Sequence, residues 1–241
     1  MLTVLSRLVL AGGIVAAIWV LAWRAHRARQ WRAALVAYRL TVPARLDLDA
    51  VVSVLGMLSG MTVRRPIVFE IAADRRGIGN YLLVPRGEAG TVLGAMRTSL
   101  PGVRTDEAPG YLKPDPVRLP GAATEYRCSC SWRPLASHRA AGAMAGVLNA
   151  LSGLGPDERV CAQWIVTGAR AVLPRGDLPA PVAGAVRDKQ AAPLLDAAGR
   201  IGAWAPHPAR AAAMVTRVAV AWRMLDAPGA FLKPRKLRGR R

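Results

Sequence analysis

Two stretches of the chain repeat one succession of short strands and amphipathic helices, and this repetition limits the fold more than any other feature. Between residues 34 and 108, apolar side chains recur at strand and helix spacing in the order βαββαβ. Residues 123–232 give the same order, with a long loop at residues 169–198. Two helices on one face of a four-stranded antiparallel sheet would bury every apolar stripe of such a unit. The sequence therefore predicts two ferredoxin-like units.

Local signals place the boundaries of these units. Asp47 or Asp49 is positioned to cap the first helix, because short polar side chains are favoured at helix amino termini. Residues 109–122, which are rich in proline and glycine, form the predicted linker between the two units. Residues 233–241 form a basic tail that we expect to be disordered in isolation.

A charge-free apolar run near the amino terminus predicts a membrane anchor. The run covers residues 8–23, and about twenty apolar residues are needed to span a bilayer, a length reached from Leu2 if Arg7 extends to the interface. Arginines follow the run directly, which by the positive-inside rule puts the amino terminus outside and the bulk of the chain in the cytoplasm. The predicted fold class is thus α+β, with residues 1–33 as a transmembrane helix and basic juxtamembrane segment in the inner (plasma) membrane. A cleavable signal peptide is the alternative, and the arginine-rich exit disfavours it.

The formal net charge of +19 indicates a surface that attracts phosphate, nucleic acid or acidic lipid. Basic residues on the cytoplasmic side of a membrane protein, or a solvated linker at the end of the chain, are the alternative explanations. The densest clusters lie next to the apolar run and at the carboxyl end. The candidate phosphate or lipid contacts are Arg24, Arg27, Arg29, Arg32, Lys233, Arg235, Lys236, Arg238, Arg240 and Arg241.

Catalytic motifs are missing from the sequence. It contains no G-x-x-x-x-G-K-[ST] loop, no G-x-G-x-x-G after a strand, no H-E-x-x-H and no G-x-S-x-G. The three histidines are far apart, and Cys128, Cys130 and Cys161 are too few for a disulfide framework or a zinc site. We therefore expect no enzymatic activity, no cofactor and no metal.

Three segments resemble the membrane-proximal, non-ATPase part of actinobacterial conjugative DNA-transfer proteins, the type IV secretion ATPases and coupling proteins. The segments are residues 67–108, 148–166 and 200–225, which are similar in hydrophobic pattern and in the placement of proline and glycine. In that family a P-loop ATPase domain commonly follows, whereas this sequence ends in its basic tail at Arg241. The resemblance implies a docking module that organises a DNA-translocating motor, either with a separately encoded ATPase or as a truncated remnant.

Two functions follow as hypotheses. The first is a membrane-anchored structural or docking component of a conjugative, type IV secretion-like apparatus. Its partners would be a separately encoded P-loop transfer ATPase or secretion-channel subunits, and it could form homo-oligomers. The second is a membrane-tethered protein that binds DNA without sequence specificity. Phe69 and Tyr81 are aromatic residues in strands of the first unit, and neither lies in an aromatic- and glycine-rich motif, which disfavours sequence-specific RNA recognition by base stacking.

Overall fold

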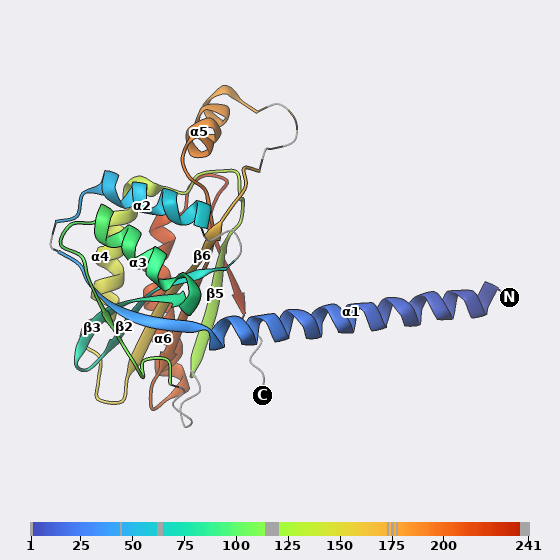
Figure 1. The fold of residues 1–241 in the computed structure, drawn as a ribbon, viewed down its shortest axis with the longest axis horizontal. Helices are drawn as coiled ribbons and strands as arrows, with labels where there is room; N and C mark the ends of the chain where they lie inside the picture. Colours follow the sequence, from blue (N-terminus) through green and yellow to red (C-terminus); the bar gives the residue numbers. More distant parts are fainter. Residues whose placement is uncertain are drawn as a thin grey trace. The chain divides into compact units, whose positions relative to one another are not determined.

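A computed structural model describes residues 2–43, 45–61, 65–113, 121–172, 174, 176 and 178–236 (Figure 1). The chain divides into two compact units, Met1–Leu35 and Val36–Arg241. The first unit consists essentially of the helix α1 (Leu2–Ala33). The second contains the sheet and all other helices.

The predicted transmembrane anchor is wrong. Among the residues that the structure describes, no helix is both long and apolar enough to cross a membrane. The charge-free run lies between Arg7 and Arg24, and at 1.5 Å per residue it is about 24 Å long, shorter than the roughly 30 Å of a hydrocarbon core. The predictions of a transmembrane helix, of an inner-membrane localisation and of an orientation in that membrane are therefore wrong.

The second unit is built on one eight-stranded sheet with the order β4-β1-β3-β2-β6-β7-β5-β8. The strands of its first half are β1 (Leu35–Thr41), β2 (Ile67–Asp74), β3 (Gly77–Pro85) and β4 (Arg104–Glu107). Those of its second half are β5 (Ala122–Cys128), β6 (Arg159–Gly168), β7 (Leu195–Trp204) and β8 (Leu232–Lys236). Read from each edge of the sheet to its middle, both halves have the same order. The first half reads β4-β1-β3-β2, and the second reads β8-β5-β7-β6.

The sheet is continuous because β2 and β6 pair with each other. They form an antiparallel ladder from Ile67↔Val166 to Asp74↔Arg159. A strand edge carries unpaired N–H and C=O groups, and this pairing satisfies the edges that two separate units would expose. The predicted fold, a transmembrane helix followed by two ferredoxin-like units, is therefore corrected to an α+β chain with a single eight-stranded antiparallel sheet.

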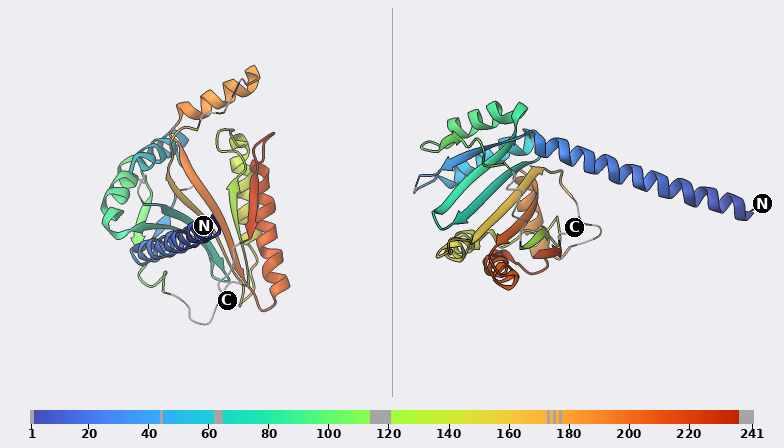
Figure 2. Two further views of the ribbon diagram at one scale, coloured as in Figure 1. Left: turned by 90° about the vertical axis from the view of Figure 1, so that its right-hand side faces the viewer. Right: turned by 90° about the horizontal axis from the view of Figure 1, so that it is seen from below.

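Two pairs of helices cover one face of the sheet (Figure 2). The helices α2 (Leu48–Met61) and α3 (Ala89–Ser99) pack together over the first half, and α4 (Ala140–Leu151) and α6 (Pro208–Trp222) over the second. Short 3₁₀ turns, Arg86–Glu88, Ser137–Arg139 and Arg223–Leu225, flank these helices. Each pair closes its own apolar core, and Trp164 of β6 packs against both cores.

The long loop predicted between β6 and β7 contains a helix. This helix, α5 (Ala180–Ala191), begins directly after Pro179, and a proline near the first turn is compatible with a helix because the amide it lacks has no intrahelical partner there. Only Val186 of α5 is buried, so the helix has no apolar stripe that the sequence could have revealed. The strand β7 then begins at Leu195, inside the predicted loop of residues 169–198.

Candidate functional site on the open face of the sheet

A row of polar side chains crosses the open face, the face opposite the four packed helices. Cross-strand partners join Tyr81 to Glu70, Glu70 to Gln163, Gln163 to Arg200, Arg200 to Glu125 and Glu125 to Arg235. Because directly opposed residues in antiparallel strands point to the same face, all six side chains lie on one side of the sheet. This polar row, consisting of Tyr81, Glu70, Gln163, Arg200, Glu125 and Arg235, runs over six adjacent strands.

Glu70 is one of two buried carboxylates in the row, with 6% of its surface exposed. The side-chain amide of Gln163 donates a hydrogen bond to its Oε2 atom over 2.5 Å. The hydroxyl of Tyr111 donates to its Oε1 atom. Both donors are neutral, so Glu70 is held in the sheet by hydrogen bonds rather than by an opposite charge.

Tyr111 belongs to the segment that leaves β4 at one edge of the sheet. Its ring stacks on Tyr81, with ring centroids 3.8 Å apart and an angle of 18° between the planes. Burial, reinforced by the neighbouring Glu70 carboxylate, raises the pKa of the Tyr111 hydroxyl far above its usual value. The hydroxyl therefore remains a hydrogen-bond donor at every physiological pH.

Cys161 lies on β6 two residues before Gln163 and on the same face. Burial, followed by the Glu70 charge and a hydrogen bond to it, raises the pKa of the Cys161 thiol well above its usual value. A protonated, buried thiol is a poor nucleophile and a poor metal ligand. Cys128, Cys130 and Cys161 are all free thiols.

Glu125 on β5 is the second buried carboxylate and is also 6% exposed. Arg127 Nε donates to Oε1 over 2.9 Å, and Arg200 Nε donates to Oε2 over the same distance. Burial by itself would raise the pKa of Glu125, but the hydrogen bonds and charges of the two arginines outweigh it, and the pKa is lowered. The carboxylate thus remains ionised and fixes both guanidinium groups on the sheet.

Five cations on the open face form what we call the basic patch. Four lie around Glu125, and Arg159 lies farther away on β6, at the level of Trp204, four residues along β7 from Arg200. Arg127 lies opposite Lys233, Arg235 lies opposite Glu125, and Arg159 lies at the start of β6 opposite Trp204. Four of the five are exposed and Arg200 is half-buried. The basic patch consists of Arg127, Arg159, Arg200, Lys233 and Arg235. The five positive charges outnumber the two carboxylates directly opposite patch residues, Glu125 and Asp74, so the patch attracts anions.

The predicted contact residues are divided between the two units of the chain. Lys233 and Arg235, assigned to a disordered tail by the sequence, lie in the edge strand β8 and join the basic patch. Lys236 ends that strand, and residues 237–241, with Arg238, Arg240 and Arg241, lie outside the described residues. The four predicted arginines of α1 are exposed and spread over an arc of about 200° around the helix. They are Arg24, Arg27, Arg29 and Arg32.

The strand residues of the row were not identified as site residues from the sequence. Glu70 lies in the run IVFEIAA, where one carboxylate is surrounded by apolar residues. A charged side chain in an otherwise buried strand requires partners, and this is the signal that could have identified it. The partners Tyr111, Gln163 and Glu70 are distant in sequence, so only the tertiary fold brings them together.

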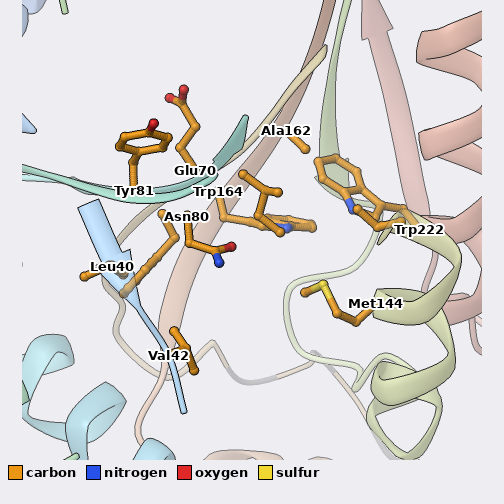
Figure 3. Close-up of a pocket in the computed structure, with 12 residues that line it drawn as sticks. Leu40, Val42, Glu70, Asn80, Tyr81, Met144, Ala162, Trp164 and Trp222 are labelled. Carbon is orange, nitrogen blue, oxygen red and sulfur yellow. The ribbon is translucent and has the colours of Figure 1, made fainter. Parts of the chain in front are cut away.

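The opposite face of the same strands contains an apolar cavity of about 200 Å³. Trp164, Trp222 and Met144 line it at the junction of the two helix pairs, with the Asn80 side chain on the same side. Figure 3 shows that Glu70 and Tyr81 point away from this group, toward the open face. The cavity is a gap between the two apolar cores and offers few polar groups for recognition.

Neither a metal site nor a known relative assigns a function. In the part of the chain that the structure describes, no group of three or more His, Cys, Asp or Glu side chains is placed to hold a metal ion. Comparisons with protein-family models, curated proteins and solved structures found no match.

Proposed function

We propose that this protein binds nucleic acid without sequence specificity, through contacts between the basic patch and the phosphate backbone. The observation that carries this proposal is the placement of five cations from β5, β6, β7 and β8 on the open face of one sheet, four of them around Glu125. Lysine and arginine contacts to phosphate dominate nonspecific nucleic-acid binding, because they release condensed counterions. Fixed side chains lose less conformational entropy on binding than a flexible tail.

The arrangement around Glu125 suits phosphate recognition. Arg127 contacts the carboxylate through Nε and Arg200 through Nε and Nη2, and each guanidinium has further N–H donors with which it can bind a second anion. Lys233 and Arg235 on the adjacent edge strand extend the positive surface. The carboxylate at the centre of the patch, Glu125, is buried and paired with two arginines. Two more carboxylates lie on the same face: Asp74, which is opposite Arg159 and pairs with Arg76, and the exposed Asp196 of β7.

The resemblance to DNA-transfer proteins supports a biological setting for this activity. In that setting the chain is a non-ATPase docking component of a conjugative apparatus that contacts the transferred DNA. Its partners are a separately encoded P-loop transfer ATPase or secretion-channel subunits. Co-purification of the tagged protein with such an ATPase tests the setting independently of DNA binding.

The DNA-binding proposal is tested by fluorescence anisotropy with a labelled 20-base-pair duplex. The triple variant Arg159→Ala, Lys233→Ala, Arg235→Ala removes three exposed cations of the basic patch and spares the two arginines that hold Glu125. We expect affinity to fall at least about tenfold and the slope of log K against log salt to decrease by about 2 to 3.

The matched control removes the same charge elsewhere. Arg86, Arg139 and Arg187 are exposed and lie outside the open face, in the turns before α3 and α4 and in α5. Their triple alanine variant should bind the duplex nearly as well as the wild type. Equal losses in both triple variants would show that net charge alone drives binding, and undetectable binding of the wild type at low salt would refute the proposed function.

A further inference from the structure

Tyr81 forms a flat aromatic platform on the open face. Its ring lies over Gly79, where an added Cβ atom would come within 2.8 Å of the ring, so the glycine allows the ring to lie against the strand. Flat aromatic rings on a sheet surface are the usual stacking partners for unpaired bases. In the structure this platform is covered by the ring of Tyr111.

The Tyr111 side chain occupies the position that an unpaired nucleobase would take on this platform. It presents a planar ring at stacking distance from Tyr81 and donates a hydrogen bond from the ring edge to Oε1 of Glu70. The other carboxylate oxygen of Glu70 accepts from Gln163. A carboxylate beside a stacking platform recognises a base whose edge carries N–H donors.

The segment that carries Tyr111 is attached weakly around it. Among described residues 108–113, Ala108 N donates a backbone hydrogen bond to Ala37 O of β1 over 2.9 Å. The other two backbone bonds are turn bonds within the segment, from Tyr111 N to Ala108 O and from Lys113 N to Gly110 O, each 3.1 Å long. Leu112 and Lys113, which directly follow Tyr111, are exposed. Beyond Ala108, the side chain of Tyr111 is the contact that holds the described part of this turn to the sheet. Its removal takes away no backbone bond of the strands.

The platform is continuous with the basic patch. Glu70 and Arg235 belong to the same polar row and are separated by four strand spacings, about 19 Å. A single strand with its phosphates on the basic patch can therefore extend a base to Tyr81. This step rests on the nucleic-acid function proposed above.

We propose that Tyr81, Glu70 and Gln163 form a binding site for one unpaired base of a single-stranded nucleic acid, and that Tyr111 occupies this site in the free protein. Guanine is the preferred base, because its N1–H and N2–H groups are adjacent donors that match the two oxygens of a carboxylate. Thymine presents carbonyl oxygens on both sides of its single N–H group, and the carboxylate repels them. Binding therefore requires Tyr111 to leave the platform.

The first test uses 2′-deoxyguanosine and isothermal titration calorimetry on the full-length protein. Tyr111→Ala should bind the nucleoside at least about tenfold more tightly than the wild type, since the competing ring is gone. Thymidine should bind this variant several-fold more weakly than deoxyguanosine. Adding Tyr81→Ala or Glu70→Gln to Tyr111→Ala should abolish the gain, and circular dichroism confirms that each variant is folded.

A second measurement uses the unmodified protein, so that the test does not depend on a variant folding. The nonanucleotide d(TTTTGTTTT) should bind several-fold more tightly than d(T)9 at equal salt. Equal affinity for the two oligonucleotides, or no difference between Tyr111→Ala and the wild type toward deoxyguanosine, overturns the base site. Deoxyguanosine carries no phosphate and does not need the basic patch, so loss of duplex binding in the patch variant is a separate outcome.

Discussion

The two buried carboxylates of the polar row are equally buried and are stabilised in different ways. Glu70 and Glu125 are each 6% exposed. Glu70 accepts hydrogen bonds from a tyrosine and a glutamine, whereas Glu125 accepts them from two arginines. One sheet face therefore contains two carboxylate centres. In its middle Glu70 is held by neutral donors, which we call the Glu70 centre, and toward the β8 edge Glu125 is held by arginines, which we call the ionic centre.

This difference separates two tasks on the same face. Around Glu125 the arginines retain donors directed to solvent, so the ionic centre can bind anions. Around Glu70 the neutral donors leave no excess positive charge, and the aromatic rings beside it favour a planar ligand. A buried charge without a partner is costly, so each centre depends on its own donors.

The largest effect that distinguishes the two centres is expected for Glu125→Gln. The substitution removes a buried charge that accepts two charge-assisted hydrogen bonds, and it leaves Arg127 and Arg200 uncompensated. We expect the free energy of unfolding to fall by about 2 kcal/mol at pH 7, measured by urea denaturation. Glu107→Gln, at an exposed position of β4, is the matched control and should change stability by less than about 0.5 kcal/mol.

The pH dependence of this effect follows from the lowered pKa of Glu125. A carboxyl group whose pKa is lower in the folded protein stabilises the fold above its unfolded pKa, about 4.3, and loses that contribution as pH falls through the folded pKa. The stability difference between wild type and Glu125→Gln should therefore be complete at pH 7 and shrink below pH 4. A difference that stays constant down to pH 2.5 would contradict the ionic description of this centre.

A smaller effect is expected for Tyr111→Phe at the Glu70 centre. The ring still stacks on Tyr81, but Glu70 loses the hydroxyl donor, which should lower the free energy of unfolding by about 1 kcal/mol. The raised pKa of Tyr111 keeps its hydroxyl protonated, so the difference should be constant between pH 6 and pH 9. Tyr38→Phe, in the core beneath α2 and α3, is the control for loss of a tyrosine hydroxyl elsewhere. If Tyr38→Phe lowered the free energy of unfolding as much as Tyr111→Phe, the hydroxyl at Glu70 would have no special role.

Local elements of this fold could be predicted because local patterns specify them. The helix α2 begins at Leu48, directly after the predicted cap residue Asp47, and Asp49 lies in its first turn. The pairing of β2 with β6 could not be predicted in the same way. It joins Glu70 to Gln163, 93 residues apart, and both strands carry apolar residues that suit an edge or a central position.

The candidate site was predictable only in part for the same reason. Lys233 and Arg235 were identified as phosphate contacts from local charge density, but their fixed place depends on β8 pairing with β5. The sequence identifies Tyr81 as an aromatic residue in a strand. It does not indicate that Tyr111, which lies in the predicted linker, stacks on the Tyr81 ring. The predicted membrane anchor was wrong for a different reason. The apolar run between Arg7 and Arg24 has the composition of a membrane-spanning helix but is too short to span a bilayer.

The smallest effect on stability is expected for Arg127→Ala, and it separates structure from function within the ionic centre. The Arg127 side chain is 49% exposed, whereas that of Arg200 is 36% exposed. Because solvent screens an exposed ion pair, Arg127→Ala should cost only about 0.5 kcal/mol in urea denaturation, with Arg200 still compensating Glu125. The same substitution removes one cation of the basic patch and should reduce the salt slope of duplex binding by about 1. If stability fell by several kcal/mol while DNA affinity stayed unchanged, Arg127 would serve the fold alone and the phosphate-binding role of the ionic centre would be refuted.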